Sequence, residues 1–342
     1  MTLSEMGEKR LIERLRQRLA AGGPRAGLVV DVGDDAAAFG LTGSDKLLLF
    51  TCDMLVEGTH FRREWHPPEK LGWKALAVNI SDIAAMGGRP TFGLISLALP
   101  GQIEVDFVDR LYSGLLRCAQ EYGVILAGGD SVGSPQGVVI DVSLLGEVER
   151  GRLLRRRGAR PGDLIAVTGP LGAAAAGLHL LSCHRQTRRG EEAGNAISVS
   201  AAEELLAALL EPRPRLAEGQ TLAATGLVTA MMDLSDGLAE DLPRLCQESK
   251  AGAKIFADKI PLPPACRQLG QEVDFALRGG EDYELLFTFA PTALPAITTA
   301  LEKVGRPPII IGEMLSPESG IQLLRPDGSE SPLPQGFEHF AA

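Results

Sequence analysis

The acidic side chains of this sequence are concentrated in short segments that also contain glycine, serine or threonine. Aspartate oxygens are hard ligands on short tethers, and they suit Mg²⁺, an ion that shares its shell between water, carboxylates and substrate phosphates. Such segments, brought to one edge of a sheet, would form a magnesium-dependent phosphate site. Six segments have this composition: 32–39 (VGDDAAAF), 50–61 (FTCDMLVEGTHF), 79–88 (NISDIAAMGG), 127–133 (AGGDSVG), 232–238 (MDLSDGL) and 278–285 (RGGEDYEL).

Several residues of these segments also have a structural interpretation. Asp34 and Asp35 can shape a Gly-Asp turn. Ser81 and Ser235 can be helix N-caps, with the aspartate that follows each of them complementing the helix dipole. The residues alone exclude neither interpretation.

Asp53 and Asp130 are harder to explain as turn residues. Asp53 closely follows the apolar run 47–50, where asparagine or glycine would serve a turn equally well. Asp130 follows Gly128 and Gly129, whose missing side chains would let a phosphate approach the backbone. We therefore expect both aspartates to have a functional role.

The signatures of other common chemistries are missing from the sequence. It has no G-x-x-x-x-G-K-[ST] loop, no G-x-G-x-x-G after a strand, and neither H-R-D nor D-F-G. The five histidines form no H-E-x-x-H motif and the five cysteines form no C-x-x-C pair, which disfavours zinc. Common nucleotide-binding folds are therefore disfavoured, and chemistry carried by acidic side chains remains.

Three further features have weaker functional interpretations. The segment 167–178 could offer helix-terminal N–H groups to an anion, but its alanines favour close packing of a helix on a sheet. Of the arginines between 150 and 160 we expect one to contact a phosphate, because most of a charge run faces solvent. His60 could orient an anion or stack on a ring, whereas a lone histidine usually has a structural role.

The composition is that of an acidic globular protein with more than one domain. The 342 residues are 45% hydrophobic and 23% charged, so the chain can bury a sizeable core and is too long for one ordinary domain. Its 40 glycines indicate many tight turns or close approaches to a ligand. With 34 basic against 44 acidic residues the net charge is -10, which argues against non-specific binding to nucleic acid or to an anionic membrane.

Cysteine usage and the first 20 residues favour a cytoplasmic protein. The five cysteines lie far apart, as expected for reduced thiols. The N-terminal residues are charged and repeat leucine and isoleucine at helical spacing, which predicts an amphipathic helix rather than a signal peptide. The most apolar stretch, 164–181, is interrupted by Gly169 and Pro170 and so cannot be one membrane-spanning helix.

Hydrophobic periodicity predicts the elements that must position these residues. In the first half, two helical patterns over 69–86 and 105–122 lie among short β-rich runs. At Arg150 an arginine-rich run begins that ends in a Pro-Gly-Asp turn signal, and we place the boundary between domains 1–149 and 150–342 there. The second half alternates strands and helices, as an α/β layer structure does. The expected strands are 28–32, 47–52, 92–99, 138–145, 164–168, 228–232, 285–289 and 309–311.

Together the motifs resemble those of the thiamine-monophosphate kinases, which belong to the ATP-binding superfamily that also contains aminoimidazole ribonucleotide synthetase. The matching motifs occur in the family's order from about residue 28 to 340, and their combination is highly specific. They are GDDAAAF, TCDMLVEGTHF, KALAVNISDIAAMGGRP, GGDSVGSP, VTGPLGAAAAGL, MDLSDGLAEDL, GGEDYELLFT and IGEM.

The resemblance implies ATP-dependent phosphorylation of thiamine monophosphate to thiamine diphosphate, the last step of thiamine diphosphate biosynthesis. It implies a requirement for several Mg²⁺ ions and leaves room for assistance by K⁺. The implied fold is α/β, with two domains of the aminoimidazole ribonucleotide synthetase type in a homodimer. In that family the N-terminal sheet pairs with the partner's sheet into a barrel, and the C-terminal α/β domain completes the nucleotide and substrate cleft.

Carried over position by position, the resemblance implies three groups of site residues. The metal ligands would be Asp35, Thr51, Cys52, Asp53, Asp82, Asp130, Asp233 and Asp236. ATP would be contacted by Gly129, Asp130, Arg156 and Ser235. Thiamine monophosphate would be contacted by His60, Glu281 and Phe337. The catalytic aspartates among these would be Asp53, Asp82, Asp130 and Asp236.

Two positions depart from the family pattern. Cys52 stands where the family often has threonine or serine, which is harmless if the position contributes its backbone carbonyl and removes one ligand if it contributes a hydroxyl. Phe337 stands where some relatives have tyrosine or tryptophan, so stacking is retained while a hydrogen bond from the ring is lost.

The acidic segments agree with the charges that this reaction brings together. The acceptor phosphate is already an anionic nucleophile at pH 7, so the site needs no strong general base. Two like unit charges ~4 Å apart cost about 4 kcal/mol at an effective dielectric constant near 20. Divalent ions held by the acidic segments would cancel that repulsion and orient the transferred group. We expect direct in-line transfer without a phosphoenzyme.

The sequence leaves alternatives to this function. Within the superfamily the chain could be a selenophosphate or an aminoimidazole ribonucleotide synthetase, but the former would need a reactive Cys or Sec near its start, and residues 1–30 contain no cysteine. From a different class, it could be a nucleotide-sensing protein that does not turn over. Release of ADP would separate an enzyme from such a sensor.

Overall fold

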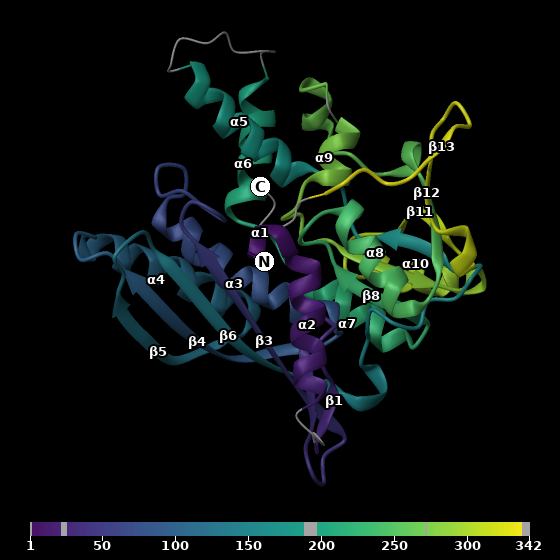
Figure 1. Ribbon diagram of the computed structural model, residues 1–342, viewed down its shortest axis with the longest axis horizontal. Coiled ribbons are helices and arrows are strands. Elements are labelled where there is room, and N and C mark those ends of the chain that lie inside the picture. Colours follow the sequence, from purple (N-terminus) through teal and green to yellow (C-terminus); the bar gives the residue numbers. More distant parts are fainter. Residues whose placement is uncertain (1, 22–25, 188–196, 271, 337–342) are drawn as a thin grey trace.

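The computed structural model describes residues 2–21, 26–187, 197–270 and 272–336. Two α/β units lie side by side, each built on one mixed β-sheet (Figure 1). The first sheet ends at Glu149, and the second begins at Leu164.

The first sheet has six strands in the order β1-β2-β3-β6-β4-β5. Neighbouring strands are antiparallel except β4 and β5, which are parallel and are connected by helix α4 (Val105–Tyr122). The strands are β1 (Leu28–Val30), β2 (Ala37–Gly40), β3 (Lys46–Val56), β4 (Arg89–Leu99), β5 (Ile125–Gly133) and β6 (Val139–Glu149).

Helix α3 (Pro68–Ala85) and helix α4 cover one face of this sheet. The two helices approach each other closely because two glycines lie at their contact. A Cβ on Gly72 would lie 2.0 Å from the carbonyl oxygen of Leu111, and a Cβ on Gly114 would lie 1.8 Å from that of Glu69. Most of α3 is therefore buried, and its side chains are held in a rigid environment.

The opposite face of the first sheet is uncovered and apolar. Alternate residues of β3 and β4 point away from the helices, as the two-residue period of a strand requires. Strand β5 is exposed along nearly its whole length at the edge of the sheet. The exposed apolar side chains on this face are Phe39, Phe50, Met54, Phe92, Leu94 and Val132.

The second sheet has seven strands in the order β13-β12-β9-β11-β7-β10-β8, antiparallel except for the pair β9 and β12. Helices α7 and α10 pack on one face, and α8 and α9 on the other, so every residue of β10 is buried. The strands are β7 (Leu164–Val167), β8 (Val228–Asp233), β9 (Gly252–Phe256), β10 (Leu285–Phe289), β11 (Ile309–Leu315), β12 (Ile321–Leu324) and β13 (Glu330–Ser331). The helices of this unit are α5 (Ala173–Thr187), α6 (Val199–Leu210), α7 (Leu216–Thr225), α8 (Leu238–Ser249), α9 (Glu272–Arg278) and α10 (Leu294–Glu302).

Helices α2 (Glu8–Ala20) and α3 connect the two units. Helix α3 packs against α7 and β8 of the second unit. Helix α2, which follows the short helix α1 (Leu3–Met6), forms ion pairs from Lys9 to Glu240 and from Arg16 to Glu248 on α8. The face between the units is therefore built from elements of both halves of the sequence.

The elements expected from periodicity are present, with differences at particular places. The helices expected at 69–86 and 105–122 are α3 and α4, and each expected strand overlaps an observed one. Strands β2, β5, β9, β12 and β13 were not expected. The alanines of α5 pack mainly against α6 and not on the sheet, which corrects that part of the interpretation of 167–178. No described helix is both long and apolar enough to cross a membrane.

Candidate active site

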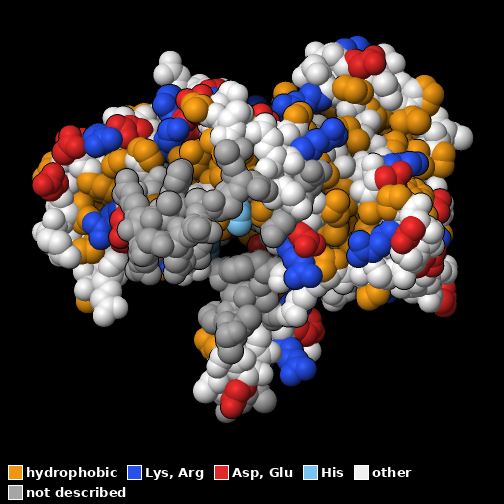
Figure 2. Space-filling view, turned by 90° about the horizontal axis from the view of Figure 1, so that it is seen from above, with side chains coloured by type: hydrophobic (Ala, Val, Ile, Leu, Met, Phe, Trp, Pro, Cys, Tyr) orange, Lys and Arg blue, Asp and Glu red, His pale blue; other side chains and the backbone are white. Residues whose placement is uncertain are grey.

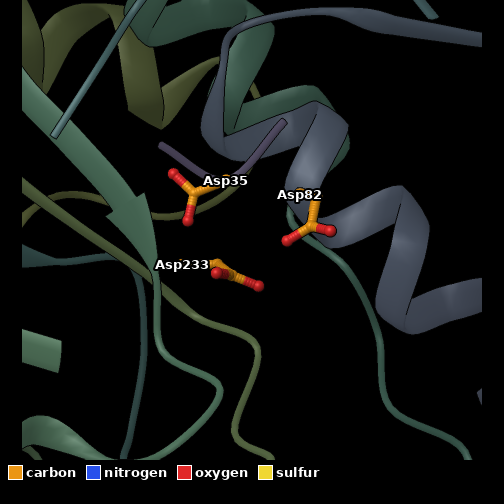
Figure 3. A group of neighbouring side chains, drawn as sticks. All are labelled: Asp35, Asp82 and Asp233. Atoms are coloured by element: carbon orange, nitrogen blue, oxygen red, sulfur yellow. The ribbon is translucent and has the colours of Figure 1, made fainter. Parts of the chain in front are cut away.

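Three carboxylates from distant segments converge between the two units. Each of Asp35, Asp82 and Asp233 offers a carboxylate oxygen, and these oxygens lie within 4.8 Å of one another (Figure 3). Asp35 lies in the turn before β2, Asp82 in the last turn of α3 and Asp233 at the end of β8. The structure thus brings together the acidic residues of three of the six segments; we call them the acid cluster.

Two hydroxyl groups orient the acid cluster. Thr51 Oγ1, on β3, donates to the Asp82 carboxylate and lies 3.5 Å from the carbonyl oxygen of Asp35. Ser81 Oγ donates to Asp233 at 2.6 Å. Because Ser81 lies within the last turns of α3, its interpretation as an N-cap is wrong.

The arginine-rich segment holds the two aspartates before β2. Asp34 accepts from Arg155 Nε at 2.9 Å and from the backbone N–H of Arg156 at 2.7 Å. The Arg156 guanidinium donates to Asp35 Oδ1 from Nη2 at 2.5 Å and from Nε at 3.1 Å. The other oxygen of Asp35 is buried and has no hydrogen-bond partner among the residues described. That oxygen is available to a ligand.

Burial raises the pKa of every carboxyl group in the acid cluster. Desolvation is the largest cause for Asp35, Asp82 and Asp233, and repulsion between the carboxylates adds to it. For Asp35 the positive charge of Arg156 opposes the shift. A bound cation would favour the ionised forms, and hard oxygen donors with one unused buried atom fit Mg²⁺.

Asp53 faces the acid cluster from the inner side of β3. The strand continues to Val56, so Asp53 lies inside it and not after its end. Its backbone N–H donates to Asn79 Oδ1 on α3 at 3.1 Å. Burial, together with the charge of Asp236, raises the pKa of Asp53 to about 6.

Ser235 and Asp236 approach the same space from the turn between β8 and α8. Asp236 accepts from Arg244 Nη1 at 2.5 Å, and its backbone N–H donates to Asp241 at 3.0 Å. The N-cap of α8 is Gly237, so Ser235 is not one. Burial and the neighbouring Asp236 charge raise the pKa of Asp241 to about 7.

A cleft of about 880 Å³ extends from the acid cluster between the two units. Figure 2 shows a hollow between them with a histidine side chain on its wall. Asp53, Asp82, Asp233, Ser235 and Asp236 all line the cleft. This arrangement can hold a cation next to a bound anionic ligand.

His60 and Glu281 also line the cleft. His60 Nδ1 accepts from the backbone N–H of Val56 at 3.0 Å, so a neutral His60 ring carries its proton on Nε2. Glu281 has a φ of 69°, a conformation that is uncommon for a residue other than glycine. Its backbone N–H donates to the Ser235 carbonyl at 2.7 Å, which places the 278–285 segment beside the 232–238 segment.

Three of the expected metal or ATP ligands are not at the acid cluster. Gly129 and Asp130 lie on β5, three strands from β3, and neither lines the cleft. Gly129 has a packing reason to be glycine, because a Cβ there would lie 1.7 Å from the Ile95 carbonyl oxygen. The Cys52 thiol lies on the outer face of the sheet, 3.8 Å from Asp141 Oδ1, so only its backbone could serve the cluster. Phe337 lies outside the described residues.

The sequence reasoning missed several buried groups that support the site. Asn79 holds Asp53, and Arg244 holds Asp236. Lys74 has no exposed surface, and its Nζ lies 2.6 Å from Glu281 Oε1. The sequence spacing could have indicated Lys74. It lies eight residues before Asp82 and therefore on the same face of α3.

Two family models match the chain. The model for AIR synthase related protein, N-terminal domain, matches residues 33–148, and the model for the C-terminal domain matches residues 160–322.

Curated proteins and solved structures that resemble this chain agree with the two family models. The chain is 34% identical over 339 residues to a thiamine-monophosphate kinase of Salmonella typhimurium, covering 98% of each chain. It is 37% identical over 293 residues to that of Aquifex aeolicus, covering 84% of this chain and 87% of the relative. Among solved structures, one described as AaThiL complexed with AMPPCP and TMP superposes with a TM-score of 0.82 at 34% identity, covering 99% of each chain.

Proposed function

This chain belongs to the thiamine-monophosphate kinase family of AIR synthase related proteins, and we propose that its acid cluster binds the metal ions of the kinase reaction. The chain is an ATP-dependent kinase that converts thiamine monophosphate and ATP to thiamine diphosphate and ADP. The observation that carries the proposal is the convergence of three carboxylates within 4.8 Å beside the cleft.

The ligand set proposed for Mg²⁺ follows from what each group can offer. Asp35, Asp53, Asp82, Asp233 and Asp236 supply carboxylate oxygens from four of the six acidic segments, and all of them except Asp35 line the cleft. Bound Mg²⁺ would neutralise the repulsion between the phosphates and orient the transferred group, and K⁺ would assist. The Thr51 hydroxyl holds Asp82, and Cys52 takes part only through its backbone.

The chain's own residues bind and align the two substrates. Arg156 and Ser235 contact ATP, while His60 and Glu281 contact thiamine monophosphate; Phe337 stays a prediction of the resemblance. An oxygen of the acceptor phosphate forms the new bond to the γ-phosphorus as the bond to the leaving ADP oxygen breaks. Because that oxygen is already anionic, no side chain needs to accept a proton.

The uncovered face of the first sheet supports a homodimer. An apolar face next to an exposed edge strand is a surface that a second copy would cover, and pairing of two such sheets would form a barrel. Asp130 and Gly129 lie on that edge strand, so dimerisation would bring them to a shared site. We retain the domain division 1–149 and 150–342 and a cytoplasmic location as parts of this proposal.

The test is an assay of the purified protein with ATP and Mg²⁺. Thiamine monophosphate, free thiamine and no acceptor are compared, and the products are separated by chromatography. We expect thiamine diphosphate and ADP in equal amounts from the monophosphate alone. ADP without thiamine diphosphate would indicate another ATP-dependent enzyme of the superfamily, and binding of ATP without ADP release would indicate a sensor.

A further inference from the structure

A buried histidine that the resemblance does not assign lies on the wall of the cleft. His66 is 2% exposed and directly precedes Pro67, the N-cap of α3. Within the described residues the ring makes at most a weak hydrogen bond to the Arg62 carbonyl, and neither ring nitrogen has a partner of good geometry. A buried polar group without a partner is destabilising, so the ring is fully satisfied only when something in the cleft bonds to it.

The surroundings of His66 keep its ring neutral. Burial lowers its pKa to about 3, the positive charge of Lys74 adds to this effect, and the Arg62 carbonyl opposes it weakly. A neutral imidazole has one N–H donor and one nitrogen acceptor. Phe61 lies edge-on to the ring, with centroids 6.1 Å apart and planes at 71°, and restricts its orientation.

Lys74 and Glu281 form a second polar group beside His66. The fully buried Lys74 Nζ lies 2.6 Å from Glu281 Oε1, but it makes no hydrogen bond of good geometry to any described residue. Glu281 is 26% exposed and faces the cleft. Polar groups with unused bonding capacity therefore gather in this part of the cleft.

Helix α3 relates this polar part to the acid cluster. Lys74, Val78 and Asp82 are spaced by about one turn and share a face, and Val78 and Asp82 line the cleft. The rise of an α-helix separates Lys74 from Asp82 by roughly 12 Å along the axis. His66 precedes the helix and so lies farther from Asp82 than Lys74 does, but it lines the same cleft. An acceptor whose phosphate lies at the acid cluster would extend along this face toward His66.

We propose that His66 hydrogen-bonds the aminopyrimidine ring of thiamine monophosphate and so helps to determine acceptor specificity. The inference rests on the proposed function, because it takes thiamine monophosphate as the acceptor. That ring carries an amino donor next to a ring-nitrogen acceptor, and a neutral imidazole can complement either group. The phosphate end of the acceptor lies too far along α3 to contact His66.

The test compares the whole acceptor with a truncated one. The KM for thiamine monophosphate is measured for wild type, His66→Phe and His66→Gln, together with the inhibition constant of the phosphorylated thiazole half of the molecule, which lacks the pyrimidine. His66→Phe should raise the KM for thiamine monophosphate at least about tenfold, because a site built to bond a polar group loses that discrimination when the bond is removed. The constants for the thiazole phosphate and for ATP should change by less than about twofold.

The remaining outcomes separate a specificity role from a structural one. His66→Gln retains a donor and an acceptor, so it should recover part of the affinity lost in His66→Phe. If His66→Phe does not fold, the comparison is made with His66→Gln alone. His179→Phe is the matched control, because His179 Nε2 already lies 3.4 Å from Cys183 Sγ. Equal losses with both acceptors, or no loss with either, would overturn the inference. Wild-type protein that forms no thiamine diphosphate would instead contradict the proposed function, before any variant is made.

Discussion

Ser81 and Asp233 connect the two units of the fold through a buried hydrogen bond of 2.6 Å. Ser81 belongs to α3 of the first unit, and Asp233 ends β8 of the second. The acid cluster is thus assembled at the contact between the units, and a change in their relative position would change the distances between its carboxylates. We therefore expect binding at the acid cluster to depend on how the two units pack.

Replacing Ser81 by alanine should weaken both packing and metal binding. The substitution leaves a buried carboxylate without its donor, which costs about 1–3 kcal/mol in the free energy of unfolding. It also frees Asp233 to rotate, so half-maximal activity should require more Mg²⁺. Thermal unfolding and a Mg²⁺ titration of activity measure the two effects. Ser113→Ala is the control, because that hydroxyl bonds only the Asp109 carbonyl on the exposed side of α4; equal effects of the two variants would contradict the prediction.

Asp53→Asn should abolish most turnover while the protein stays folded. The amide removes a charged ligand from the proposed metal site, and a loss of about a thousandfold in kcat is expected for a residue of this kind. The Tm of thermal unfolding should not fall, because the variant also removes a repulsive charge from beside the cluster. The matched control is Asp141→Asn, on the opposite face of the neighbouring strand β6. Near-wild-type activity of Asp53→Asn would remove this residue from the metal site.

Without divalent ions, the protein should lose stability as the pH rises. Burial raises the pKa of Asp53 from 3.8 to about 6, and raises those of Asp82 and Asp233 well above 3.8. Because the folded values exceed the unfolded value, the contribution of these groups to the unfolding free energy is complete below about pH 4 and is lost as the pH rises through the folded values. Mg²⁺ bound to the ionised carboxylates, as we propose, should restore the lost stability.

Thermal unfolding at pH 5 and pH 8, in EDTA and in excess Mg²⁺, tests this dependence. The rise in Tm on adding Mg²⁺ should be larger at pH 8, where the carboxylates are ionised without having to release protons. EDTA should also stop catalysis, and excess Mg²⁺ should restore it. An equal rise in Tm at both pH values, or activity in EDTA, would argue against a carboxylate metal site.

The sequence predicted the long helices and the identity of the acidic residues better than their placement. Helix α4 has a strong apolar period and helix α3 is apolar on nearly all sides, and the expected bounds of both agree with the structure to within about a residue. Strand β5 was missed because Gly128, Gly129 and Gly133 give it little intrinsic strand preference, and its pairing with β4 decides its conformation. Local propensity does not contain that tertiary information.

The interactions that support the site could not be predicted, because they join residues far apart in the sequence. Ser81 and Asp233 are 152 residues apart, and Arg156 and Asp35 are 121 apart. Local rules assign Ser81 a capping role, whereas the observed role depends on how the second unit packs on α3. Hydrogen bonds between buried polar groups are fixed by this packing and not by their neighbours in sequence.

Leu94→Arg on the outer face of the first sheet should disrupt the proposed homodimer. Leu94 is 50% exposed on β4, between the exposed strand β5 and strand β6, and a charge there would be buried without a partner if a second sheet covered it. Light scattering after gel filtration should show a dimeric wild type and a monomeric variant. Leu116→Arg, at an equally exposed leucine on the solvent side of α4, is the control. A monomeric wild type would contradict the dimer.

Glu281→Gln should weaken the binding of thiamine monophosphate more than the binding of ATP. The glutamate faces the cleft, and its side chain is held by an ion pair to the buried Lys74 at 2.6 Å. The amide removes the charge that the resemblance assigns to acceptor binding, so the KM for thiamine monophosphate should rise by about tenfold while the KM for ATP changes little.

The same substitution leaves the Lys74 ammonium buried without a counter-charge, which destabilises the folded state. A second variant separates this effect from substrate binding: Lys74→Met combined with Glu281→Gln removes both charges and should recover thermal stability while the acceptor KM stays high. Steady-state kinetics and thermal unfolding of the two variants measure the difference. If the double variant recovered the acceptor KM together with the stability, Glu281 would act through the fold and would not contact the acceptor.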